Sequence, residues 1–186
     1  GQLIEILGGI VMIKLTRQVE DKIEYWEVWK HKTRLYIHKG YVGETGVTYK
    51  KGVLFKNAND LMDELAKEML DQGFDYLSEE NLIQFVIHYN GTDNDLYKVL
   101  KKRHSIENIM NECLGWTGNG DCDGGDIDLQ DGSVNIFCYV FDVDKAIATT
   151  IIELKKYKIL DNAVIAYLDA NEDYITLYPE GAVFSL

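Results

Sequence analysis

The first third of the chain alternates apolar and polar side chains with a period of two residues, and this pattern constrains the fold more than any other feature of the sequence. It is carried by four segments rich in β-branched and aromatic residues, at 13–19, 22–30, 33–43 and 47–55. The separators, Glu-Asp at 20–21, His-Lys at 31–32 and Glu-Thr-Gly at 44–46, are so short that only hairpins fit between the segments. The sequence therefore predicts an antiparallel β-meander.

The period then changes to that of a helix over residues 57–74. The apolar residues at helical spacing are Leu61, Leu65, Met69 and Leu70. Asn57 or Asn59 can cap the N-terminus, and Gly73 stands where a helix commonly ends. We expect this helix to cover one face of the meander.

The remainder of the chain mixes helical and strand patterns. The expected helices are 78–89, 93–104, 105–116 and 144–157. The expected strands are a nearly continuous apolar run at 133–143 and a hairpin of 162–170 with 173–181. This order predicts a small α+β domain with a β-α-β-β core and its helices on one sheet face.

Together these patterns predict an α+β protein of several parts. We expect an N-terminal extension (1–11), a β-sheet module with its covering helix (12–78), a helical connector (79–104) and an acidic α+β domain (105–186).

Charge is distributed unevenly along the chain, whose formal net charge is −12. Residues 104–186 have a net charge of −11, whereas residues 14–56 hold 10 basic and 5 acidic side chains, a net of +5. The split favours two modules with different surfaces and different partners.

Three cysteines, Cys113, Cys122 and Cys138, are odd in number and lack the spacing of a zinc site. We therefore expect buried, unreactive thiols and a reducing cytoplasmic location. No apolar run approaches the ~18–20 residues of a membrane span, so no membrane association is expected.

The segment 114–132, LGWTGNGDCDGGDIDLQDG, concentrates glycine and aspartate between a helical pattern and a strand. Asn119, Asp121 and Asp123, followed by Gly124, match the opening of a calcium-binding loop, although Gln130 stands where an EF-hand has its glutamate. The candidate metal ligands are Asn119, Asp121, Asp123, Asp126 and Asp128. Calcium is the one cofactor that the sequence suggests.

Two other interpretations of this segment remain open. It can be a recognition surface with an acidic field and Trp116 as an anchor, for which a basic protein partner is suited. It can also be an acidic turn whose glycines supply positive φ and whose tryptophan packs inside. A phosphate cradle is disfavoured, because the segment has no lysine and its aspartates repel phosphate.

The sequence provides no catalytic motif. His31, His38, His88 and His104 each fall in a different expected element, and none has the context of a zincin or of a nucleophile elbow. We therefore assign no catalytic residue and lean towards a non-enzymatic protein.

Residues 13–77 resemble a WGR-type domain, a small antiparallel sheet with a covering helix found in DNA-repair polymerases and bacterial regulators. The similar stretches are YWEVWK (25–30), HKGYVGETG (38–46), Ala58 and ELAKEMLDQGFDYL (64–77). The naming Trp-Gly-Arg is replaced by Lys39-Gly40-Tyr41. The resemblance implies a sheet whose basic and aromatic groups near this hairpin contact DNA in some relatives.

The second part, with LGWTGNGDCDGGDI and the later LYP, resembles a family of uncharacterised bacterial α+β domains. Small acidic proteins of this general kind often neutralise secreted toxins. We therefore expect a bacterial binding or adaptor protein, of immunity-like type, that recognises a basic protein partner. The expected contact residues are Trp116, Asp121, Asp123, Asp126 and Asp128.

Two alternative functions follow from other parts of the chain. The first is a nucleic-acid-associated regulator that uses the basic side chains of the WGR-like module. Its candidate residues are Lys30, Lys32, Arg34, Lys39, Lys50 and Lys51. A solvated basic strand edge explains the same residues. The second alternative is a calcium-binding module at residues 119–131.

Overall fold

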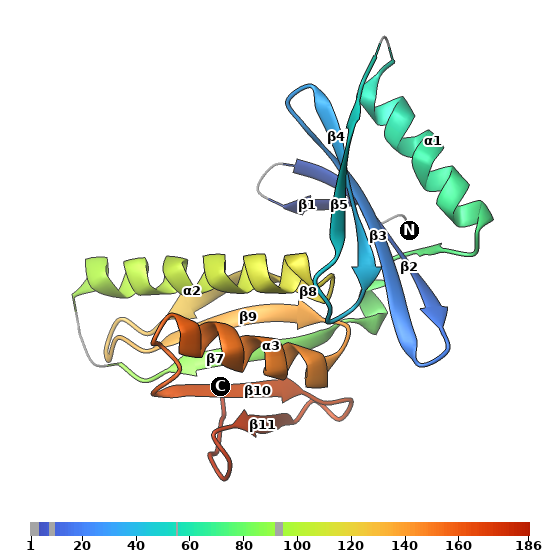
Figure 1. The fold of residues 1–186 in the computed structure, drawn as a ribbon. Helices are drawn as coiled ribbons and strands as arrows, with labels where there is room; N and C mark the ends of the chain where they lie inside the picture. The colour runs from blue at the N-terminus through green and yellow to red at the C-terminus, as the bar shows by residue number, and fades with distance from the viewer. Residues whose placement is uncertain (1–3, 8–9, 55, 92–94) are drawn as a thin grey trace. The chain divides into compact units, whose positions relative to one another are not determined.

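The computed structural model describes residues 4–7, 10–54, 56–91 and 95–186, and it confirms the expected α+β class. The chain divides into two compact units, Gly1–Asn81 and Leu82–Leu186, which are coloured blue to green and green to red in Figure 1. Each unit contains an antiparallel sheet with its own helices. None of the helices in the described ranges is both long and apolar enough to cross a membrane.

The first unit is built on the expected meander. Its strands are β1 (Ile4–Leu7), β2 (Ile10–Val19), β3 (Lys22–His31), β4 (Arg34–Tyr41) and β5 (Val47–Gly52), and they pair in chain order. A short strand, β6 (Asp75–Tyr76), returns to pair with β2. The part of the N-terminal extension that the structure describes therefore belongs to this sheet, since β1 pairs with β2.

Helix α1 (Ala58–Asp71) confirms the expected covering helix (Figure 1). Of the two candidate caps, Asn57 is the N-cap: its side-chain oxygen accepts the backbone N–H groups of Asn59 and Asp60. Gly73 has φ +96°, and the helix ends in a Schellman arrangement in which the N–H of Phe74 reaches the carbonyl of Met69.

The core of the first unit lies between α1 and one face of the sheet. The helix contributes Leu61, Met62 and Ala66, and the strands contribute Ile13, Leu15, Trp26, Val28 and Leu35. Alternate residues of the same strands point to the opposite face, so the period of two fixes which side chains are presented on each side.

The second unit has the element order β7 (Ile83–Tyr89), α2 (Leu96–Trp116), β8 (Gly120–Ile127), β9 (Val134–Val140), α3 (Val143–Lys156), β10 (Ala163–Leu168) and β11 (Tyr174–Tyr178). Its sheet order is β11-β10-β7-β9-β8, and all neighbours are antiparallel. The succession β-α-β-β-α-β, extended by β11, is the split βαβ motif of ferredoxin-like domains.

The sheet of the second unit has one face against the helices and one face on which the C-terminal segment packs. Side chains of β7, β9 and β10 alternate between the two: Phe85, Ile136 and Ile165 join α2 and α3 in one core. Val86 and Ala166 point the other way, where Phe184 packs against them.

The expected helix at 78–89 is wrong. Only a single 3₁₀ turn, η1 (Glu79–Asn81), follows Ser78, and residues 83–89 form β7, the central strand of the second sheet. A central strand is buried on both faces, so Phe85, Val86 and Ile87 form a continuous apolar run that resembles a buried helix. The helical connector expected at 79–104 therefore contains a core strand.

Two further expectations are corrected. The helices expected at 93–104 and 105–116 are one continuous helix, α2, because buried residues on one side (Val99, Ile106, Met110, Cys113 and Leu114) carry the apolar stripe across the expected boundary.

The segment 114–132, expected as a loop or turn, contains strand β8, which pairs with β9 along its length. A bulge between Cys122 and Gly125, with Gly124 at φ +87°, accommodates the extra residue.

Candidate functional site

The six basic residues proposed for nucleic-acid contact are all exposed, and none of them forms an ion pair with any described carboxylate. Their strands separate them into two groups. Arg34 and Lys50 lie on the sheet face opposite α1, and Lys32 lies in the β3–β4 turn next to them. The other three flank core residues on the α1 side: Lys30 and Lys51 stand opposite Leu35, and Lys39 stands opposite Trp26.

Aromatic rings accompany the first group. Trp29, Tyr36 and Lys50 stand side by side across β3, β4 and β5. The rings of Trp29 and Tyr36 stack with centroids 5.8 Å apart and an interplanar angle of 13°. His31 meets Tyr36 edge-on at 6.0 Å, and the Lys50 ammonium lies 5.7 Å from the Tyr36 ring centroid.

We refer to Trp29, His31, Lys32, Arg34, Tyr36 and Lys50 as the aromatic–basic face. Residues 29–43 and strand β5 contain no acidic residue, so along these segments the cations have no acidic neighbour in the sequence. On β1, Glu5 stands in the same row of the sheet, opposite Met12, which in turn stands opposite Trp29. The face combines the two chemical elements that bind single-stranded nucleic acid: cations for phosphates and rings on which bases stack.

The same sheet face carries a buried polar network nearer its middle. Glu27 Oε1 accepts a hydrogen bond from His38 Nδ1 at 2.6 Å, and the Tyr25 hydroxyl lies 3.2 Å from His38 Nε2. Lys14 Nζ lies 3.8 Å from Glu27 Oε2. Each of the four residues is at most 5% exposed. Burial, and then the nearby Glu27 carboxylate, raise the pKa of Tyr25 well above its usual range.

This network joins β2, β3 and β4 and was missed by the sequence analysis. His38 Nδ1 donates to Glu27 and the Tyr25 hydroxyl lies within hydrogen-bond distance of His38 Nε2, so one chain of polar contacts links Tyr25, His38 and Glu27. A hydroxyl whose pKa is raised makes a poor nucleophile near neutral pH. The arrangement fixes the pairing of the three strands.

The acidic residues expected to contact a partner are distributed along and around β8. Asp121 stands opposite Tyr139 and Asp126 opposite Asn135, both on the sheet face away from the helices. Asp123 is exposed within the bulge, and Asp128 lies beyond the strand end. Trp116 is the last residue of α2 and is 49% exposed, so it is not sealed in the core.

Several of these carboxylates already have hydrogen-bond partners. Asn135 Nδ2 donates to Asp126 at 2.8 Å, and Asn135 Oδ1 accepts from His88 Nδ1 at 2.8 Å. Asp128 accepts the backbone N–H of Gln130 at 2.8 Å. The acidic surface is therefore partly committed to the internal structure of the second unit.

The five candidate calcium ligands are not gathered around one point. The carboxamide of Asn119 is completely buried: its oxygen accepts the backbone N–H groups of Phe141 and Asp142, and its nitrogen donates to the Asp142 carbonyl at 2.9 Å. Across the described residues, no group of three or more His, Cys, Asp or Glu side chains is arranged to hold a metal ion. Asn119 holds β8 to the start of α3 rather than presenting an oxygen to a cation.

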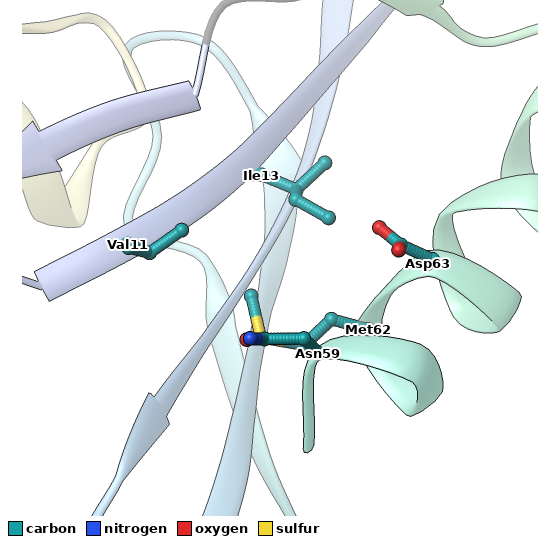
Figure 2. Close-up of a pocket in the computed structure, with 5 residues that line it drawn as sticks. All are labelled: Val11, Ile13, Asn59, Met62 and Asp63. Carbon is teal, nitrogen blue, oxygen red and sulfur yellow. The ribbon is translucent and has the colours of Figure 1, made fainter. Parts of the chain in front are cut away.

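A small cavity of about 250 Å³ lies between β2 and the start of α1 (Figure 2). Val11 and Ile13 line it from the strand, and Asn59, Met62 and Asp63 line it from the helix. Pockets for small molecules usually enclose ~300–1,000 Å³ and bring several polar groups together. This cavity is smaller, and among the described residues that line it only Asn59 and Asp63 have polar side chains.

Comparisons with known proteins give no match: no family model, no curated protein and no solved structure is similar to this chain at a significant level.

Proposed function

We propose that the first unit binds single-stranded nucleic acid on the aromatic–basic face. The observation that carries the proposal is the placement of Arg34 and Lys50 beside the Trp29–Tyr36 stack, with all the neighbouring cations exposed. Lysine and arginine attract phosphates regardless of base sequence. Trp29 and Tyr36 are half-buried. Aromatic rings stack only on bases that are unpaired, so a single strand is favoured over a duplex.

The proposal differs in position from the resemblance of residues 13–77 to a WGR-type domain, which implies that groups near the β4–β5 hairpin contact DNA. The Lys39-Gly40-Tyr41 stretch, which replaces the naming motif, lies at the end of β4. Gly40 packs closely there, since a Cβ on it would stand 3.0 Å from the Gly46 Cα atom. In this chain the aromatic–basic face takes the contact role at the other end of β4, towards the β3–β4 turn.

The test compares two triple variants of the full chain that remove the same charge from opposite faces. One is Lys32→Ala/Arg34→Ala/Lys50→Ala, and the matched control is Lys30→Ala/Lys39→Ala/Lys51→Ala. Binding of a fluorescent mixed-sequence DNA 12-mer is followed by anisotropy at low salt. We expect the first variant to lose at least tenfold in affinity and the control to lose less than threefold. Equal losses, or no binding by the parent protein, would refute a face-specific site.

Recognition of a basic protein by the second unit is a second candidate. Residues 82–186 contain 17 acidic and 8 basic side chains, and the exposed Asp123 and Asp126 lie on β8, an edge strand. Charge reversal of these two residues should weaken capture of a basic partner while leaving the melting temperature nearly unchanged. Asp126 and Asp128 already accept hydrogen bonds within the second unit, so this candidate is weaker than the first.

A further inference from the structure

Two of the three cysteines face each other across neighbouring strands of the second unit. Cys122 of β8 stands directly opposite Cys138 of β9. Both side chains point to the helix-covered core, which also contains Cys113 from α2. All three thiols are free.

The hydrogen-bond pattern shows which kind of antiparallel pair Cys122 and Cys138 form. Backbone N–H of Phe141 donates to the carbonyl of Asn119 at 2.9 Å, so these two residues form a hydrogen-bonded pair. Hydrogen-bonded and non-hydrogen-bonded pairs alternate along an antiparallel ladder. The Cys122–Cys138 pair lies three positions along the ladder from the Asn119–Phe141 pair, so it is a non-hydrogen-bonded pair. The N–H of Cys122 accordingly points away from β9 and donates to Asn111 Oδ1 at 2.8 Å.

Non-hydrogen-bonded pairs bring opposite side chains closest together, with Cα atoms about 4.5 Å apart. Disulfides need Cα separations of about 4.4–6.8 Å. The two cysteines therefore fall inside the range for a bond that leaves the ladder in place.

The two thiols differ in access and in acidity. Cys122 is 7% exposed on an edge strand, whereas Cys138 is completely buried. A hydrogen bond from the Cys138 thiol lowers the pKa of Cys122, and the same interaction, together with burial, raises the pKa of Cys138. This is the division expected of an attacking and a resolving cysteine, because the thiolate is the reactive form.

We propose that Cys122 and Cys138 form an oxidation site at which a hydroperoxide closes an intramolecular disulfide between β8 and β9. The Cys122 thiolate attacks one peroxide oxygen: an S–O bond forms, the O–O bond breaks, and the leaving oxygen takes a proton. The Cys138 thiol then attacks the Cys122 sulfur, so that an S–S bond forms and the S–O bond breaks with release of water. The two thiols lose two electrons and two protons, and hydrogen peroxide is reduced to two waters.

The experiment exposes the full chain to hydrogen peroxide, alkylates the remaining thiols after unfolding, and maps the linked peptides by mass spectrometry. The parent protein and Cys113→Ala should both give a Cys122–Cys138 linkage with a loss of two hydrogen atoms, reversed by dithiothreitol. Cys138→Ala should instead accumulate a sulfenic acid at Cys122 that a dimedone probe captures. If Cys138→Ala fails to fold, the parent protein and Cys113→Ala still test the proposal, because both retain Cys122 and Cys138.

Three results would overturn the proposal. The first is a linkage through Cys113, and the second is a disulfide between two copies of the chain. The third is the recovery of all three thiols in the parent protein after treatment that fully oxidises a free cysteine peptide.

Discussion

The buried carboxamide of Asn119 gives the sharpest prediction about stability. Replacing it by alanine removes three side-chain hydrogen bonds. Phe141 N–H keeps a bond to the Asn119 backbone carbonyl, and the Asp142 carbonyl keeps one from Ala146 N–H. Asp142 N–H loses its partner, at a cost of about 1–3 kcal/mol. Asp142 is also the N-cap of α3 and accepts from Lys145 N–H, so its displacement costs about 1 kcal/mol more.

Asn119→Ala should therefore destabilise the second unit by about 3 kcal/mol. Hydrogen exchange of the slowest amides in β7 and β9 measures this unit alone, and 3 kcal/mol corresponds to exchange faster by about 150-fold. The matched control is Asn90→Ala, which removes one exposed carboxamide bonded to His88 and should cost less than about 1 kcal/mol. An Asn119 variant no less stable than the Asn90 control would refute the role assigned to this side chain.

Three further predictions concern other positions. Gly46→Ala should destabilise the first unit by more than about 3 kcal/mol, because the added Cβ would stand 2.5 Å from the Lys39 carbonyl oxygen. The control Gly52→Ala should cost less than about 1 kcal/mol, because a Cβ there meets nothing within 4 Å. Similar urea midpoints for the two variants would contradict this prediction. Burial raises the pKa of Cys113 from 9.0 to about 12, so the unfolded thiol ionises first and stability falls as pH rises from 9. Between pH 8 and 10.5 the Cys113→Ala variant should lose about 2 kcal/mol less stability to urea than the parent protein loses, and an equal loss in the two proteins would exclude this thiol as a contributor. Phe184→Ala should lower the free energy of unfolding by about 3 kcal/mol, because this side chain is buried on the face of the second sheet opposite its helices. An unchanged melting temperature would show that the Phe184 side chain adds no stability.

The first unit was largely predictable because its local patterns agree with one another. Alternation over residues 13–55 and the short turns leave few arrangements other than a meander, and Asn57 and Gly73 mark the ends of α1 by their own chemistry. The polar network was missed because the turn was expected one residue early, at 31–32 instead of Lys32 and Thr33. That shift moves each partner by two positions and would place Glu27 opposite Tyr36 rather than His38.

The second unit was harder because its decisive contacts are non-local. The apolar run of β7 carries no period, and only its position between β9 and β10 makes it a strand. Glycine and aspartate disfavour strands, so β8 depends on pairing with β9 rather than on its own propensity. The role of Asn119 depends on Asp142, which lies 23 residues away and which no local pattern connects to it.

The salt dependence of DNA binding measures how many phosphates the aromatic–basic face contacts. If Lys32, Arg34 and Lys50 each neutralise one phosphate of a single strand, a plot of log K against log salt concentration should have a slope of about −2. The Lys32→Ala/Arg34→Ala/Lys50→Ala variant should have a slope near zero, and the variant with substitutions on the α1 side should keep the parent slope. A parent protein that does not bind the strand at low salt, or a slope that the first variant leaves unchanged, would show that the aromatic–basic face does not bind phosphates.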